Sequence, residues 1–230
     1  MSSADLHLRT LYVLDPDGRI ISTREPGATR GPLFSLVRSE TRCVWAVRSD
    51  VPNDIAGELD DLARREPLVA DFRDSPVYAD RYLSILRSRV SLEVQVSSGP
   101  AFTFPDVVAH SNDVLTVENE RQLDRNFQGW VAGEIAAGRG PVMAIMNDGD
   151  PVSICFCARS SDLAAEAGVE TAEAFRGRGL APRVTAAWAL AIRASGRIPL
   201  YSTSWSNSAS LKVAVKLKLE PYASAWSVWE

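Results

Sequence analysis

The fold is decided by residues 169–181, which read VETAEAFRGRGLA. The β-rich start predicts a strand, the two glycines predict a tight turn, and the apolar residues after them predict an amphipathic helix. A turn of this kind points several backbone N–H groups at one spot, and the helix adds a partial positive charge there. Arg176 and Arg178 add full charges. The stretch is therefore typical of a pyrophosphate cradle.

The turn differs from the two commonest glycine-rich phosphate motifs. Residues 176–181 match the pattern R-x-x-G-x-A. They are not a dinucleotide-binding fingerprint, because Pro182 stands where the third glycine is needed, and they are not a P-loop, because no Gly-Lys-Ser/Thr follows. At this point an ordinary glycine-containing connection with solvated arginines stays open as the alternative.

A second motif narrows the choice. Asn207 and Ser210 open the next expected helix, after a strand that ends in the polar residues 202–204. Together the two motifs resemble those of the GNAT superfamily of acyl-CoA-dependent N-acyltransferases. The resemblance covers roughly residues 112–230 and implies a GNAT-like α/β fold with a central mixed sheet. The whole chain also looks like a bacterial group in which a smaller N-terminal α/β region precedes the GNAT domain.

The resemblance implies a role for each part of the two motifs. The strand would pair with the pantetheine amides of coenzyme A, the turn would bind its pyrophosphate, and the later helix would contact the pantetheine arm. The residues that would bind acetyl-CoA or coenzyme A are Val169, Glu170, Thr171, Arg176, Gly177, Arg178, Gly179, Leu180, Ala181, Asn207 and Ser210.

The chain departs from the family pattern where a general acid is often found. Many members place a tyrosine seven residues after the asparagine, and this chain has Ala214 there. The proton for the leaving thiolate would then come from Tyr222, Tyr201 or Ser204, or from water. A second departure is Lys218 in place of the usual helix-ending glycine, which concerns the following turn rather than the chemistry.

Two glutamates are the candidates for the general base. On the expected strand Glu166, Gly168 and Glu170 share one face, because side chains alternate along a strand. Two carboxylates suit an open cleft better than a core, and there they would hold and deprotonate an amine. Glu166 and Glu170 are therefore predicted to be catalytic, with solvated or salt-bridged carboxylates as the alternative.

The first part of the chain is expected to form an N-terminal α/β region over residues 1–95. Strand-like runs cover residues 8–14, 19–22, 32–38, 42–48 and 90–96, with helices over 52–65 and 76–87. Residues 97–100 are expected to break the last strand, and glycine, proline, serine, asparagine and aspartate mark a soft boundary over 90–112. The role of residues 1–95 is left open between three alternatives. The region covers the acceptor pocket, mediates dimerisation, or is a degenerate half of the same fold.

The GNAT-like domain is expected over residues 112–230. A helix is predicted for 118–137, then a hairpin of strands 141–146 and 152–158 around the Asn-Asp-Gly-Asp turn at 147–150. A strand over 166–171, a helix over 180–194, a strand over 200–205, a helix to about 217 and a strand over 223–229 complete the order. This alternation indicates a mixed sheet with packed helices.

Composition limits the class of protein. The chain has 230 residues and a formal net charge of −4, which argues against generic nucleic-acid binding. No apolar run is long enough to span a membrane, so a cytoplasmic protein without membrane contacts is expected. Cys155 and Cys157 lack zinc-ligand spacing and are interpreted as reduced, buried thiols. No metal site is expected, and His110 is a candidate for lining the acceptor pocket.

The function that these observations favour is transfer of an acetyl group from acetyl-CoA to a primary amine by direct attack. The acceptor is a small-molecule or peptide amine, and a homodimer is possible. One alternative is a coenzyme A or acyl-CoA sensor without turnover, which the missing helix tyrosine motivates. Another is an unrelated α/β domain.

Overall fold

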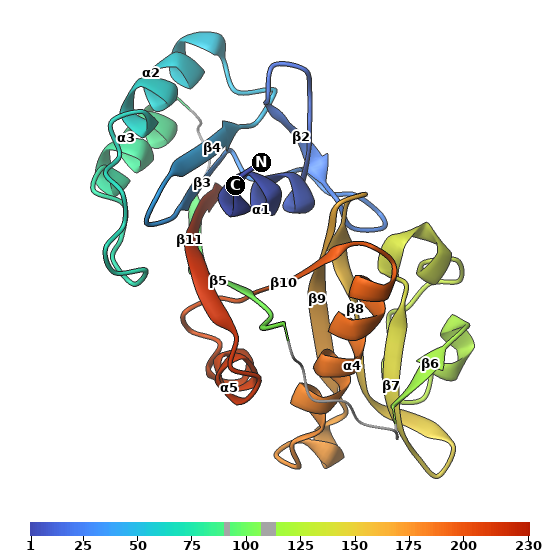
Figure 1. Ribbon diagram of the computed structural model, residues 1–230. Coiled ribbons are helices and arrows are strands. Elements are labelled where there is room, and N and C mark those ends of the chain that lie inside the picture. Colours follow the sequence, from blue (N-terminus) through green and yellow to red (C-terminus); the bar gives the residue numbers. More distant parts are fainter. Residues whose placement is uncertain (90–92, 107–113) are drawn as a thin grey trace.

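One large mixed sheet organises the chain, which this computed structural model describes for residues 1–89, 93–106 and 114–230 (Figure 1). Within those residues nine strands lie in the order β4-β3-β11-β5-β10-β9-β8-β7-β6, and β1 and β2 form a separate two-stranded sheet. The expected α/β class with a mixed sheet is confirmed. The strands are β1 (Tyr12–Leu14), β2 (Ile20–Thr23), β3 (Phe34–Arg38), β4 (Cys43–Val47), β5 (Gln95–Thr103), β6 (Val114–Val117), β7 (Val142–Asn147), β8 (Asp150–Ser160), β9 (Ala164–Thr171), β10 (Ile198–Ser202) and β11 (Glu220–Trp229).

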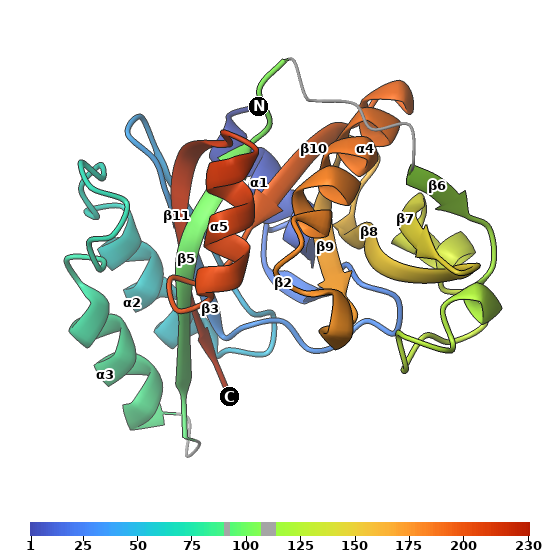
Figure 2. The same ribbon diagram turned by 90° about the horizontal axis from the view of Figure 1, so that it is seen from below.

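Helices cover both faces of the sheet (Figure 2). They are α1 (Ser3–Leu11), α2 (Asn53–Ala63), α3 (Ala79–Arg89), α4 (Leu180–Ala194) and α5 (Ser208–Lys216). Because side chains alternate along a strand, consecutive residues of the β5 segment point to opposite faces of the sheet. Ala101 packs with α1, whereas Phe102 and Phe104 pack with α4 and α5.

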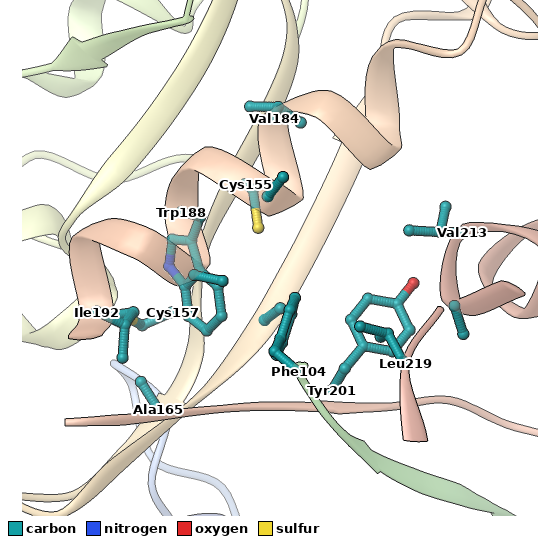
Figure 3. Packing of buried hydrophobic residues seen from close by; sticks show 14 of the residues in the cluster. Phe104, Cys155, Cys157, Ala165, Val184, Trp188, Ile192, Tyr201, Val213 and Leu219 are labelled. Carbon is teal, nitrogen blue, oxygen red and sulfur yellow. The ribbon is translucent and has the colours of Figure 1, made fainter. Parts of the chain in front are cut away.

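The apolar residues that link α4 and α5 to the sheet form one packed cluster (Figure 3). Trp188 of α4 and Tyr201 of β10 are among its largest fully buried side chains. Cys155 and Cys157 of β8 are buried and free, as the sequence predicts. This packing holds the start of α4 beside the end of β9, which positions the glycine turn.

The sheet opens between β9 and β10. These strands pair in parallel at Ala164–Glu166 and Ile198–Leu200, with Glu166 opposite Leu200. Beyond that point β9 continues to Thr171 beside β8, while β10 ends at Ser202. The edge of β9 past Glu166 therefore faces a gap between diverging strands, the β9–β10 splay.

Residues 1–95 and 112–230 contribute to the same sheet. β3 pairs with the C-terminal β11, and β5 lies between β11 and β10. The helix α1 contacts β9 and β8 as well as β3 and β4, and Figure 1 shows it across the middle of the molecule. The N-terminal region thus supports the face of the sheet behind the splay.

Several predicted elements are confirmed. The helix over 180–194 has the expected bounds, and the hairpin of β7 and β8 turns at Asp148 and Gly149, both of which have positive φ. Asn207 caps α5, which settles the choice that the sequence leaves open between Ser206 and Asn207. The helices α2 and α3 and the strands β2, β3 and β4 fall within a few residues of the predicted ranges.

The predicted helix over residues 118–137 is wrong. Short helical turns at Glu120–Gln122 and Ile135–Arg139 replace it. Gly129, Gly133 and Gly138 have φ of 105°, 93° and 127°, a conformation that ends a right-handed helix. The apolar residues that suggested the helix still pack together, since Leu123 and Phe127 are buried against β7 and β8.

The predicted strand over residues 8–14 is also wrong in its first half. A capping box, in which Ser2 and Asp5 bond each other's backbone N–H, starts the helix α1 at Ser3. Ala4, Leu8 and Leu11 are buried at helical spacing, and the strand β1 begins only at Tyr12. The strength of this cap outweighs the β propensity of the later residues.

The predicted strand break at residues 97–100 is wrong as well, because β5 runs through them. A Cβ atom on Gly99 would lie 1.7 Å from the backbone oxygen of Thr203. This glycine therefore allows two segments of the backbone to approach closely, and it does not form a turn. Part of the soft boundary, residues 90–92 and 107–112 with His110 among them, lies outside the described residues.

Candidate active site

A cleft of about 1050 Å³ occupies the splay between β9 and β10. Its walls are the free edge of β9, the turn before α4, the end of β10 and the first turns of α5. Most of the sequence-predicted site residues line it together, although they come from two motifs about 30 residues apart. Those that do are Glu166, Val169, Glu170, Thr171, Arg176, Gly177, Gly179, Leu180, Ala181, Asn207 and Ser210.

The glycine turn forms one end of the cleft. Gly177 and Gly179 have φ of 78° and 75°, and an added Cβ on either would meet nothing within 4 Å. The backbone there is in the left-handed region and open to approach. Because α4 begins at Leu180, its first N–H groups lack intrahelical partners and are available to an anion.

The two arginines of the turn differ in role. Arg176 lines the cleft, and its Nε donates to the oxygen of Thr171 at 3.1 Å, which braces the turn against β9. Arg178 is not among the lining residues. Its Nη2 donates to the oxygen of Ala174 at 3.0 Å, and its guanidinium stacks over the Phe175 ring at 4.9 Å. Arg178 therefore supports the outside of the turn.

The helix α5 forms the opposite wall. Asn207 Oδ1 accepts from the N–H of Ser210 at 3.0 Å, which leaves the side-chain NH₂ group to serve as a donor. Ser210 Oγ lies 2.6 Å from Tyr201 Oη. Lys212 and Lys216, one turn apart on this helix, also line the cleft. Together with Arg176 they place positive charge on the walls, opposite the carboxylates of β9.

Glu166 lies at the point where the strands part. Its side chain is 5% exposed, and Oε1 accepts a hydrogen bond from Ser202 Oγ. Oε2 is 3.6 Å from Arg159 Nη1 and has no hydrogen bond within the described residues. This carboxylate is thus held in place with one oxygen available to a further donor.

Glu170 lies farther along the same strand and is exposed to the cleft. The surrounding walls partly desolvate its carboxyl and raise its pKa, while the charge of Arg139 acts in the opposite direction. A carboxylate with a raised pKa is suited to accept a proton. The odd-numbered residues Ala165 and Ala167 pack under α4, as the parity of the strand requires.

Tyr222 lies on β11, outside the residues that line the cleft. Its Oη is 2.9 Å from Nδ1 of His7 on α1. Burial raises the pKa of Tyr222 well above its ordinary value and lowers the pKa of His7. The placement of Tyr222 is that of a buried partner of α1, and it does not support a direct role at the thioester.

Sequence reasoning missed several lining residues. They are Arg159 near the end of β8, and Lys212 and Lys216 on α5. Lys212 and Lys216 are four residues apart, directly after Asn207 and Ser210, and this spacing places both lysines on one face of the helix. The sequence therefore contained a signal for them. Asn126 and Phe127 reach the cleft from the segment that was wrongly predicted as helix.

Among the described residues no group of three or more His, Cys, Asp or Glu side chains is arranged to hold a metal ion. In the same residues no helix combines the length and low polarity that crossing a membrane requires. An open glycine turn at a helix start, nearby cations and two carboxylates fit a phosphate-bearing cosubstrate and a cationic acceptor.

Comparison with known proteins agrees with this arrangement. Residues 107–222 match the family model described as GNAT acetyltransferase. A GNAT-family acetyltransferase structure from Novosphingobium aromaticivorans is 18% identical, with a TM-score of 0.50 over 59% of this chain and 66% of that one. A conserved Staphylococcus epidermidis protein of unknown function is 11% identical, with a TM-score of 0.52 over 99% and 96% of the two chains. No curated protein matches significantly. The family model covers half of the sequence, and the chain belongs to the GNAT acetyltransferase family.

Proposed function

We propose that this protein transfers an acetyl group from acetyl-CoA to a primary amine by direct attack. The observation that carries the proposal is the single cleft at the β9–β10 splay, which joins an anion cradle, a free strand edge and two carboxylates. No one of these features is specific alone. Along the cleft, the anion cradle, the strand edge and the carboxylates follow one another in the same order as the phosphate, the amide arm and the thioester of the cosubstrate.

The residues of the chain divide the binding work. The turn around Gly177 and Gly179 would hold the pyrophosphate through backbone N–H groups, with Arg176 adding charge. The free edge of β9 from Val169 to Thr171 would pair with the pantetheine amides. Asn207 would donate from its NH₂ group to the same arm, since its oxygen is occupied by the helix cap.

The carboxylates would act at the acceptor end. An amine attacks only when neutral, so a base must remove a proton near pH 7. Glu170, with its raised pKa and exposed position, would accept that proton, and Glu166 would orient the ammonium group before transfer. A backbone N–H of β9 near Val169 would polarise the thioester carbonyl.

The cysteines do not suggest a covalent intermediate. Cys155 and Cys157 are buried, and burial raises the pKa of both thiols. A protonated, buried thiol is a poor nucleophile. This supports direct attack by the amine.

A non-catalytic sensor of coenzyme A is the second candidate. The observation that favours it is Ala214, which is buried where many family members have a tyrosine. The two functions differ in turnover. Thiol release from acetyl-CoA over a panel of polyamines, amino sugars and peptide N-termini supports the transferase, whereas tight binding without release on any amine supports the sensor.

Binding itself is tested by thermal unfolding. Coenzyme A at about 100 times its Kd should stabilise the fold by about 2.7 kcal/mol. Gly179→Glu should abolish this shift, because it places a carboxylate at the anion cradle.

Gly196→Glu is the matched control for that variant. Gly196 ends the same helix, has φ of 79° and likewise has nothing within 4 Å of an added Cβ. Both variants therefore carry a similar backbone strain. Equal coenzyme A stabilisation in the two variants would rule out the cradle.

The finer assignments belong to the same proposal. The acceptor is a small-molecule or peptide amine, which the carboxylates of the cleft favour. Residues 112–230 carry the chemistry, and residues 1–95 support the acceptor side through α1. A cytoplasmic location and a homodimer stay predictions.

A further inference from the structure

We propose that Tyr201 is the general acid that protonates the departing thiolate, in place of the helix tyrosine that Ala214 lacks. The proposal rests on the function proposed above. It assigns the role to a strand residue that enters the cleft from β10, at a different place in the fold from the expected helix position.

The first support is the position of Tyr201 at the vertex of the splay. Leu200 is the last residue of β10 that pairs with β9, opposite Glu166, and Tyr201 follows it directly. Tyr201 lines the cleft. A thioester whose arm runs along β9 from the glycine turn would end near this vertex.

The second support is the hydrogen bonding of the hydroxyl. Tyr201 Oη lies 2.6 Å from Ser210 Oγ, and either atom can be the donor. When Ser210 Oγ donates, the phenolic proton points to the backbone oxygen of Ser210 at 3.3 Å, a long hydrogen bond that it can exchange for a better acceptor. The N–H of Ser210 is itself bonded to Asn207 Oδ1, so the cap of α5 fixes the position of this pair.

The third support is packing that leaves Tyr201 little freedom. Its ring is T-shaped to Phe104 at 6.5 Å, and it shares a buried cluster with Val213 and Ala214 (Figure 3). Ala214 is 2% exposed, so a tyrosine there would need space that the cluster already fills. The small side chain of Ala214 thus fits a cluster in which the ring of Tyr201 is already packed.

Burial raises the pKa of Tyr201 to about 12, with Ser210 opposing the shift. The phenol is therefore protonated near neutral pH and is available as a donor.

The amine nitrogen forms a bond to the carbonyl carbon, and the C–S bond then breaks with its electron pair moving to sulfur. The Tyr201 proton passes to sulfur, so that the thiol leaves neutral. Glu170 passes the proton that it takes from the ammonium group to solvent, and then accepts the second proton, which the nitrogen loses after attack. Because Tyr201 is 1% exposed, the proton that returns to it comes from solvent through the partly exposed Ser210 Oγ.

The test measures the ionisation of the bound coenzyme A thiol and needs no acceptor. A hydrogen bond from Tyr201 to sulfur stabilises the thiolate, so Tyr201→Phe should raise the thiol pKa of bound coenzyme A by about one unit. Thiolate ultraviolet absorbance against pH, at saturating coenzyme A, reports this value. The chain's buried thiols are subtracted with a sample without coenzyme A.

Tyr222→Phe is the matched control. It also removes one hydroxyl from a buried tyrosine in the same sheet, but that hydroxyl faces His7 rather than the cleft. The thiol pKa in this variant should equal that of the wild type. A shift in both variants, or in neither, would overturn the assignment of Tyr201.

Folding is controlled separately. The double variant Tyr201→Phe/Ser210→Ala removes both members of the hydrogen-bonded pair and leaves no unpaired hydroxyl, so it should fold even if Tyr201→Phe does not. It should show the same raised thiol pKa. If wild-type protein does not bind coenzyme A, the proposed function fails; if it binds and the pKa does not move, only the role of Tyr201 fails.

Discussion

At the scale of single residues, Glu166 and Glu170 show how one strand gives two carboxylates different roles. Glu166 is buried and held by Ser202 and Arg159. Glu170 is exposed to the cleft, with a raised pKa. The first is positioned by fixed partners, and the second is free to exchange a proton with substrate.

Glu170→Gln should lower the rate of thiol release and remove the acidic limb of its pH profile. A base must be ionised to accept a proton, so wild-type activity should rise as pH increases through the raised pKa of Glu170. Steady-state rates from pH 4 to 9 with a productive amine check this. A profile unchanged by the substitution would exclude Glu170 as the base.

The same variant has a predicted effect on stability. Because the folded-state pKa is raised, the carboxyl favours folding below its unfolded value of about 4.5, and this contribution is lost as pH rises through the folded pKa. Glu170→Gln should therefore have a Tm at pH 7 equal to or above that of the wild type. Glu58→Gln, an exposed glutamate on α2, is the control and should show no comparable gain.

At the scale of elements, the start of α5 combines a structural and a binding role in one side chain. Asn207 Oδ1 caps the helix, and its NH₂ group is the proposed donor to the pantetheine arm. Asn207→Ala should lose the cap and lower the free energy of unfolding by about 1 kcal/mol. It should also weaken coenzyme A binding.

Asn207→Asp separates the two roles. The aspartate keeps an oxygen for the cap but lacks the amide donor, so stability should stay close to wild type while coenzyme A affinity falls by about five- to tenfold. Urea unfolding and calorimetric titration measure the two quantities. Loss of affinity in the alanine variant alone would mean that Asn207 acts only through the helix cap.

At the scale of the whole molecule, the shared sheet couples the two halves of the chain. β11 pairs with β3 on one side and β5 on the other, and α1 packs behind β9. Apart from the small β1–β2 sheet, the described strands of the two halves therefore belong to one sheet. The N-terminal region is part of the scaffold that sets the splay.

The full chain should consequently unfold in one transition. Urea curves followed by tryptophan fluorescence and by far-ultraviolet circular dichroism should coincide, because Trp45 and Trp226 report β4 and β11 while Trp188 reports α4. Saturating coenzyme A should shift both curves together. Two separated transitions, with only one shifted, would instead show that residues 1–95 fold as an independent unit.

Elements that depend on local signals can be predicted from the amino-acid sequence. Glycines with positive φ, the Asn207 cap and the alternation of β9 depend on neighbours a few residues away, so the turn, α4, α5 and the face of Glu166 and Glu170 were readable. Where local signals conflicted, the predicted element was wrong: the positive-φ glycines after residue 128 break the helix expected over 118–137, and the Ser2 cap starts a helix where a strand was expected.

The partners that lie opposite those elements follow from contacts in the folded chain. The pairing of β3 with β11, the close approach of Gly99 to Thr203 and the contact of Tyr201 with Ser210 join segments distant in the chain or on separate elements. Such contacts depend on packing and strand register, which no local pattern encodes. For that reason residues 169–181 were enough to predict the anion cradle, whereas the choice of Tyr201 over Tyr222 and Ser204 needed the contacts of the folded chain.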